Sequence, residues 1–190
     1  EKIGKERAPE RLSEIKEEFG QSLSEVALPK IASMFEKTNL EAKDINKIIV
    51  VDGPGSFTGI RIGITIAKVY AWSLNIPITT ITSLEAMALS SDEEKVHVPM
   101  INARRGYVYT AIYDKDYNEL LKPQHMKLED LLKELEKINE YEFISNDKFE
   151  GIENIKEYNP NLEKVVNYFK DKDSVNPHAV NPEYLKLTAA

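Results

Sequence analysis

Residues 47–63 read KIIVVDGPGSFTGIRIG, and this stretch decides the fold. Its first five residues are a β-branched run typical of a strand that is buried on both faces. A glycine-rich loop follows, and residues 60–74 then form an apolar helical segment. Residues 78–81 predict a second strand, and a further helix is expected from Ser83. The order strand, glycine loop, helix, strand, helix predicts an α/β fold.

Both ends of this unit carry helix signals. Ser22 and Glu25 have the spacing of a capping box. Apolar residues then recur every three or four positions through residue 35, which predicts an amphipathic helix over 22–37. Pro29 lies inside that helix and predicts a kink or a short first segment, because proline lacks an N–H. The Ser83 hydroxyl is expected to cap N–H groups at the start of the later helix.

The pattern changes near residue 94. Two strands are expected to form a hairpin whose turn places Gly106 at a positive φ. Helical stripes, a further short strand and terminal turns follow. The predicted ranges are strands 96–101, 107–113 and 143–145, helices 128–138 and 162–169, and turns at 176–177 and 181–182. This division predicts two α/β lobes, residues 1–94 with the glycine loop and residues 95–190.

Composition limits the possible classes of protein. The 190 residues carry 25 Lys+Arg and 32 Asp+Glu, a formal net charge of −7, and no cysteine. Disulfide-stapled modules, thiolate zinc sites and cysteine nucleophiles are therefore excluded. No run approaches the roughly 18 apolar residues of a membrane helix. The acidic total disfavours a protein that binds RNA on its own, and a cytoplasmic location is expected.

The glycine loop invites a phosphate-binding interpretation, because N–H groups at a helix N-terminus attract anions. A Walker loop would need a lysine where Ile60 stands, and a dinucleotide fingerprint would need a glycine in place of Thr58. The favoured interpretation is structural: the glycines permit a sharp turn and a close approach of helix to sheet. The weak anion-binding candidates are Gly53, Gly55, Ser56 and Thr58.

Other reactive side chains have equally plain explanations. Ser56 lacks the flanking glycines of a nucleophile elbow. The three histidines are far apart in sequence, so a helical metal pair is not expected. Asp52 can hold a cation or simply begin a turn. The pair Arg104 and Arg105 can contact a phosphate or a carboxylate, although a solvated turn explains it as well.

The segment 60–74 has apolar residues on two faces. One face covers its own sheet, so the other needs a second covering element. That cover is either the helix at 22–37 in the same subunit or another chain. An exposed patch of this kind would exceed what a monomer usually tolerates, which predicts a helical interface.

Several motifs resemble the bacterial TsaB (YeaZ) family. They are Gly53-Pro-Gly-Ser-Phe-Thr-Gly-Ile-Arg-Ile-Gly63, Ala67-Lys68, Ile76-Pro77, Ser83-Leu-Glu-Ala86, Ala103-Arg-Arg-Gly106 and Pro182-Glu-Tyr-Leu185. The resemblance implies an actin/Hsp70-like (ASKHA, ribonuclease H-like) two-lobed fold, whose N-terminal strand pair is missing here.

The same resemblance implies a noncatalytic subunit in the formation of N6-threonylcarbamoyladenosine at position 37 of tRNAs that read ANN codons. Implied partners are a TsaD-type catalytic subunit, a TsaE-type ATPase, a second copy of the chain when TsaD is absent, and tRNA only through the complex. No cofactor or metal is implied. The first two helices would form the interface, with candidate residues Leu28, Ile31, Arg61, Ile64, Ala67, Lys68, Ala71 and Trp72. The alternative is a nucleotide-binding phosphotransferase or a peptidase-like enzyme of the same fold.

Overall fold

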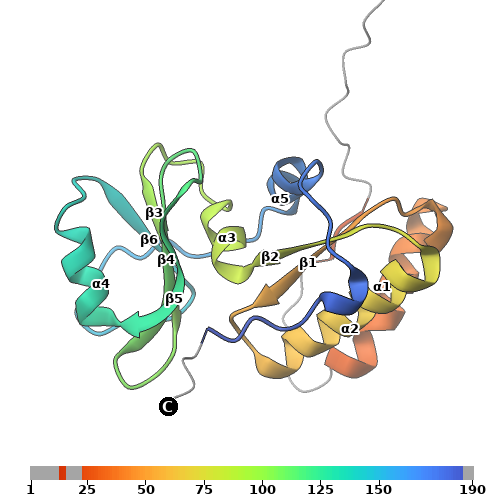
Figure 1. Ribbon diagram of the computed structural model, residues 1–190, viewed down its shortest axis with the longest axis horizontal. Coiled ribbons are helices and arrows are strands. Elements are labelled where there is room, and N and C mark those ends of the chain that lie inside the picture. Colours follow the sequence, from red (N-terminus) through yellow and green to blue (C-terminus); the bar gives the residue numbers. More distant parts are fainter. Residues whose placement is uncertain (1–12, 16–22, 186–190) are drawn as a thin grey trace, which may run out of the picture.

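The computed structural model describes residues 13–15 and 23–185. Figure 1 shows two sheets side by side, each with its own helices. The first sheet pairs β1 (Ile48–Gly53) with β2 (Ile78–Thr82) in parallel. The second has the order β5-β4-β3-β6, with β3 at Val96–Asn102, β4 at Tyr107–Tyr113, β5 at Glu119–Lys127 and β6 at Tyr141–Ile144. The α/β prediction is therefore confirmed.

Five α-helices accompany these strands in the part of the chain that the structure describes. They are α1 (Leu23–Thr38), α2 (Phe57–Leu74), α3 (Ser83–Ala88), α4 (Leu128–Leu135) and α5 (Leu162–Phe169). Two short 3-10 helices, η1 (Ala42–Asp44) and η2 (Pro177–Ala179), lie in the connections. Among the described helices, none combines the length and the apolar composition that crossing a bilayer requires.

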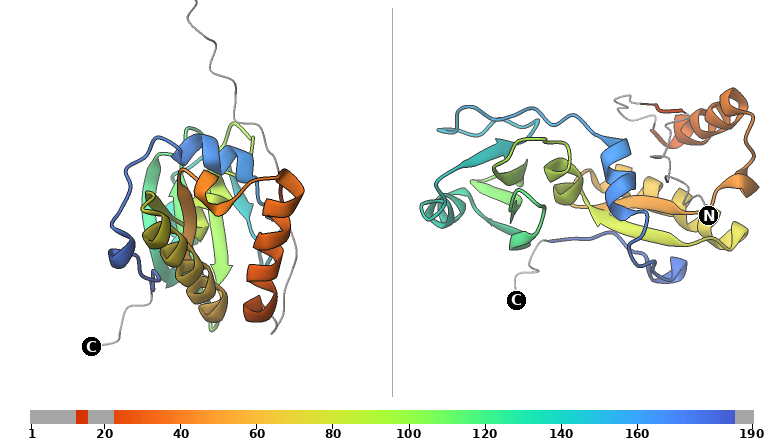
Figure 2. Two further views of the ribbon diagram at one scale, coloured as in Figure 1. Left: turned by 90° about the vertical axis from the view of Figure 1, so that its right-hand side faces the viewer. Right: turned by 90° about the horizontal axis from the view of Figure 1, so that it is seen from above.

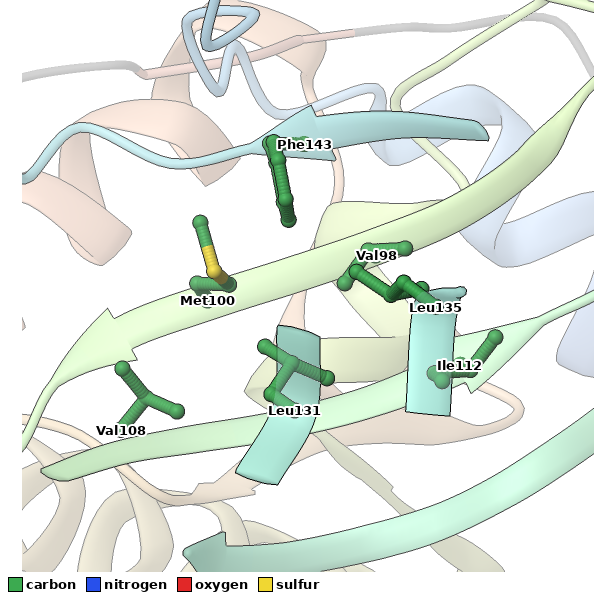
Figure 3. Close-up of a cluster of buried hydrophobic side chains, with 7 residues drawn as sticks. All are labelled: Val98, Met100, Val108, Ile112, Leu131, Leu135 and Phe143. Carbon is green, nitrogen blue, oxygen red and sulfur yellow. The ribbon is translucent and has the colours of Figure 1, made fainter. Parts of the chain in front are cut away.

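The core of the second sheet lies between its strands and α4 (Figure 3). Leu131 and Leu135 of α4 are buried there, as the leucine stripe predicts. They pack against side chains of three strands: Val98, Met100, Val108, Ile112 and Phe143. Strand β5 was not predicted, because its sequence includes Pro123 and lacks a clear alternation of apolar residues. It is an edge strand that pairs only with β4, a position where proline is tolerated.

The core of the first sheet lies between β1, β2 and α2, and it includes a residue from the far end of the chain. Val180 is buried against α2 beside Val50 and Ile78. The backbone N–H of Val175 donates to the Ile78 carbonyl at 2.8 Å. The chain thus returns from the second sheet to the first after residue 162, as the right-hand view of Figure 2 shows. The division at residue 94 stays a prediction.

Local details differ from the sequence-based expectations. Helix α1 runs through Pro29 as one helix, so a separate first segment is absent. Thr82, not Ser83, caps α3, because its hydroxyl accepts from the Glu85 N–H at 3.0 Å. Strand β1 is not buried on both faces, since Val51 is 38% exposed. The expected Ser22 cap and the strand remnant at 1–4 lie outside the described residues.

Candidate functional site

The glycine loop lies against the C-terminal segment of the same chain. Gly53 has φ +124°, and a Cβ added there would lie 2.8 Å from the carbonyl oxygen of Glu183. The Glu183 N–H donates to the Asp52 carbonyl at 2.8 Å, which fixes this approach. Gly53 is therefore needed because one backbone passes directly over another.

The side chains around this loop are acidic. Burial raises the pKa of Asp52 to about 6; a hydrogen bond with Thr80 opposes this shift, and the nearby Glu183 and Glu85 carboxylates contribute to it. The Asp52 Oδ1 atom is buried without a hydrogen-bond partner in the described part of the chain. An added phosphate would meet this negative charge, which favours the structural interpretation of the loop.

The remaining anion-binding candidates also have local explanations. The Ser56 hydroxyl accepts from the Gly59 N–H at 3.3 Å and caps α2. A Cβ on Gly55 would lie 3.5 Å from Ile60, an ordinary contact. Thr58 is exposed in the first turn of α2. Anion binding by these residues stays a prediction.

Residues 176–185, called here the C-terminal strap, run along one side of α2. The Lys68 ammonium donates to the Val180 carbonyl at 2.9 Å and to the His178 carbonyl at 3.3 Å. Arg61 donates through Nε to the Tyr184 hydroxyl at 3.2 Å. Of the predicted interface residues, Arg61 and Lys68 therefore bind the chain's own strap.

Aromatic contacts complete the attachment of the strap. The Tyr184 and Phe57 rings are stacked with centroids 5.7 Å apart, and the Arg61 guanidinium lies 4.2 Å from the Phe57 centroid. His178 meets Trp72 edge-on at 6.3 Å, yet Trp72 remains 66% exposed. Trp72 therefore borders the strap and still has surface available to a partner.

Three of the predicted interface residues are wrongly assigned. Ile64, Ala67 and Ala71 are buried in the core of the first sheet, where they pack against β1 and β2. The small alanine side chains let α2 lie close to the strands. A partner cannot reach these residues, and a charge at Ile64 or Ala67 would disrupt the fold rather than an interface.

Part of the apolar surface of α1 and α2 stays exposed. Helix α1 has no buried residue, and Leu28 is 53% exposed, while Ile31 is half-buried. On α2, Val69 is 54% exposed and two isoleucines at helical spacing from it are half-buried. We call this set the helix face; its members are Leu28, Ile31, Ile62, Ile66 and Val69.

The two helices cover each other only partly. The Phe35 and Tyr70 rings stack with centroids 6.5 Å apart, and Leu23 approaches Gly59, where an added Cβ would lie 3.7 Å from it. The left-hand view of Figure 2 shows α1 standing beside α2. This pairing leaves Leu28 and Val69 exposed, and the three isoleucines of the helix face half-buried.

The two arginines lie away from the helix face. Arg104 and Arg105 form the tip of the β3–β4 hairpin, and Gly106 has φ +77° as predicted. Within the described residues, no group of three or more His, Asp or Glu side chains could hold a metal ion. A cavity of about 240 Å³ between the sheets is lined mainly by apolar side chains, and Asp147 at its rim already accepts from the Asn102 N–H at 2.7 Å.

Comparison with known proteins identifies the family. A family model described as TsaD, tRNA N6-adenosine threonylcarbamoyltransferase, matches residues 15–165. A Bacillus subtilis protein named tRNA threonylcarbamoyladenosine biosynthesis protein TsaB is 33% identical over 182 residues, covering 86% of this chain and 80% of that protein. The chain belongs to the TsaB (YeaZ) family.

Further relatives agree with this placement. The TsaB protein of Escherichia coli is 35% identical over 94 residues, which cover 48% of this chain and 41% of that protein. The solved structure of YeaZ from Pseudomonas aeruginosa has a TM-score of 0.62 at 17% identity, with 86% of this chain and 85% of that chain covered. The predicted actin/Hsp70-like fold class is confirmed.

Family membership also draws attention to the strap, which reasoning from residue patterns missed. The motif Pro182-Glu-Tyr-Leu185 resembles the TsaB family, but its local sequence pattern predicts no role for it. In the structure its members lie over Gly53 and stack on Phe57. The motif and the glycine loop are therefore two halves of one contact.

Proposed function

We propose that this chain is a noncatalytic partner subunit in the formation of N6-threonylcarbamoyladenosine at position 37 of tRNAs that read ANN codons. Its relatives in Bacillus subtilis and Escherichia coli are named for the biosynthesis of this nucleoside. Its direct partner is a TsaD-type catalytic subunit in the cytoplasm. A TsaE-type ATPase joins the assembly, and a second copy of the chain takes the partner's place when the chain is alone.

The helix face is the observation that supports this proposal. An exposed Leu28 on α1 and an exposed Val69 on α2 leave apolar surface that a partner's helices can cover. Burial of such surface contributes about 25 cal/mol per Å². Trp72 borders this surface, and exposed tryptophans are frequent hot spots of binding.

The surroundings of the described histidines support a noncatalytic role. His97 is fully buried, lies 2.8 Å from Glu142 and stacks on Tyr117. His125 stacks on Tyr107, and His178 packs against Trp72. Each imidazole therefore packs against other side chains, and none lies beside the hydroxyl groups of the glycine loop.

The alternative of a peptidase has one observation behind it: a similar solved structure, from Pseudomonas aeruginosa, is described as a protein with similarity to peptidase YEAZ. A serine peptidase needs a hydroxyl next to a general base. The Ser56 hydroxyl instead accepts from the Gly59 N–H and caps α2. The helix-face proposal uses the exposed apolar residues, which the peptidase alternative leaves unexplained.

The test combines assembly and reconstitution with the TsaD-type and TsaE-type proteins of the same organism. Val69→Asp changes an exposed residue of the helix face, and Leu132→Asp is the matched control, because Leu132 is 36% exposed on α4. Light scattering after size exclusion should give a one-to-one complex for the wild type and for Leu132→Asp, and none for Val69→Asp.

The outcomes separate the parts of the proposal. Val69→Asp should keep its thermal midpoint and lose tRNA modification in the reconstituted reaction. A Val69→Asp chain that assembles like the wild type would refute the helix face as the docking surface. If the reconstituted reaction modifies tRNA equally well without the wild-type chain, the proposed function itself is refuted.

A further inference from the structure

The tip of the β3–β4 hairpin has an unusual backbone. Arg104 has φ +67° and Arg105 has φ +53°, and Gly106 follows at +77°. Arginine adopts the left-handed region only at an energetic cost, which glycine avoids. The turn is held by the Arg104 N–H, which donates to Asn102 Oδ1 at 2.8 Å, and by the Tyr107 N–H, which donates to the Arg104 carbonyl at 3.0 Å. The fold thus fixes two arginines at positions where glycine or asparagine would be easier to accommodate.

Both arginine side chains are exposed and available. Neither guanidinium forms a hydrogen bond or an ion pair with any residue that the structure describes. Lys127 lies next to them, since it pairs with Tyr107 across the β4–β5 ladder. The first turn of α4 contains two acidic residues, Glu129 and Asp130, and this helix packs on the face of the sheet that Val108 covers. Asp130 forms an ion pair with Lys133 at 2.9 Å. Arg104, Arg105 and Lys127 thus place three cations together on a chain whose formal charge is −7. The nearest carboxylates come from the start of α4, where the Leu128 N–H donates to the Gly106 carbonyl at 2.9 Å, and from Asp147, which accepts from the Asn102 N–H at 2.7 Å.

Three rings lie beside these cations. The Tyr107 and His125 rings are parallel within 4°, with centroids 4.8 Å apart. Tyr109 meets the same imidazole at 5.2 Å with a tilt of 48°. All three side chains are only partly buried, so some of each ring is open to solvent.

The strand geometry places the rings and Lys127 on one face. Tyr107 and Tyr109 alternate with Val108, whose side chain is buried in the α4 core. The ladder pairs Tyr109 with His125, so His125 and Lys127 share the face of the two tyrosines. We call this set the ring platform; its members are Tyr107, Tyr109, His125, Lys127, Arg104 and Arg105.

We propose that the ring platform binds single-stranded RNA, with a base stacked on the exposed ring surface and phosphates bound by Arg104 and Arg105. Aromatic faces stack any base, and arginine forks match phosphate oxygens. Because the inference rests on the proposed function, the RNA expected there is an unpaired loop or end of the tRNA substrate. If the ligand were an acidic protein surface in place of RNA, it would form ion pairs with the arginines, and the three exposed rings would have no role.

The chain offers a variant that removes the charges without disturbing the turn. Arg104→Gly/Arg105→Gly places glycine at two left-handed positions, so the hairpin should be at least as stable as in the wild type. Asn154→Gly is the matched control, because Asn154 also has a left-handed φ, +56°, in a distant loop. Tyr109→Leu keeps an apolar side chain and removes the ring.

Fluorescence anisotropy on the assembled complex, with a labelled tRNA anticodon stem-loop as the probe, measures the effect. The double glycine variant should bind about tenfold more weakly near 50 mM salt. The slope of log K against log salt should become shallower by about 1.4, since each single-strand phosphate contact contributes about 0.7. Tyr109→Leu should weaken binding with the slope unchanged, and Asn154→Gly should match the wild type.

Equal affinity and equal slope in the wild type and the double glycine variant would overturn the inference. The inference would also be overturned if the double glycine variant bound RNA normally but no longer retained a protein subunit in the complex. That result would show that the hairpin tip contacts a protein. The proposed function is tested separately by the wild type: if it supports tRNA modification while the double glycine variant binds RNA equally well, only the ring platform is refuted. If the wild type supports no modification, the proposed function fails.

Discussion

Replacing Gly53 with alanine tests the contact between the glycine loop and the C-terminal strap. The new Cβ would lie 2.8 Å from the Glu183 carbonyl oxygen and 3.2 Å from Ile60 Cδ1. The first of these neighbours is backbone and cannot rotate away, so the strap must shift. Gly63→Ala is the matched control, because an added Cβ at Gly63 has nothing within 4 Å.

The magnitude follows from three contributions. A non-glycine residue at φ +124° costs about 1–3 kcal/mol. Loss of the hydrogen bond from Glu183 to the Asp52 carbonyl costs about 1 kcal/mol. Partial exposure of Val180 as the strap moves adds about 1 kcal/mol. Gly53→Ala should therefore lower the free energy of unfolding by about 3–5 kcal/mol, which is large for a single substitution.

Urea unfolding followed by circular dichroism measures both variants. Gly63→Ala should raise the free energy of unfolding by about 0.5–1 kcal/mol, because alanine is the better helix former inside α2. The same chemical change thus has opposite signs at two positions ten residues apart. A Gly53→Ala protein as stable as the wild type would refute the close backbone approach.

Three further predictions concern stability. Burial raises the pKa of Asp52 from 3.8 to about 6, so folding takes up a proton between these pH values, and the free energy of unfolding should fall as pH rises through this window. Asp52→Asn should flatten this part of the plot of unfolding free energy against pH. At pH 7 the variant should be more stable than the wild type by about 1–2 kcal/mol after allowance for solvent screening. A steep slope that persists in Asp52→Asn would contradict this cause. Lys68→Met removes the donor to the Val180 and His178 carbonyls and should cost about 1–3 kcal/mol, with faster proteolysis within 176–185; unchanged cleavage would show that the strap does not need Lys68. Leu131→Ala should cost about 2–5 kcal/mol in thermal unfolding, while Leu132→Ala on the same helix should stay within about 1 kcal/mol, because only Leu131 is fully buried; equal costs would contradict the orientation of α4.

Much of the fold was predictable because its helices and strands carry their own local signals. The β-branched run before the loop became β1, and the leucine stripe became the buried side of α4. Strand β5 was missed because an edge strand buries little and tolerates Pro123. Its place in the sheet depends on pairing with β4, which local sequence does not encode.

The candidate site was only half predictable, for a physical reason. Helical projection showed that α2 has two apolar sides, but it could not say which side the sheet covers. The choice depends on close packing, and the small Ala67 and Ala71 face β1 and β2. Contacts between residues more than a hundred positions apart, such as that of Lys68 with Val180, leave no periodic signal at all.

Hydrogen exchange on the complex with the TsaD-type subunit tests the helix face most directly. Helix α1 has no buried residue and should exchange readily in the free chain. On addition of the partner, the amides of Leu23–Thr38 should become at least tenfold slower to exchange, and those of α4 should not change. Protection that appears on α4 while α1 exchanges as before would contradict the account.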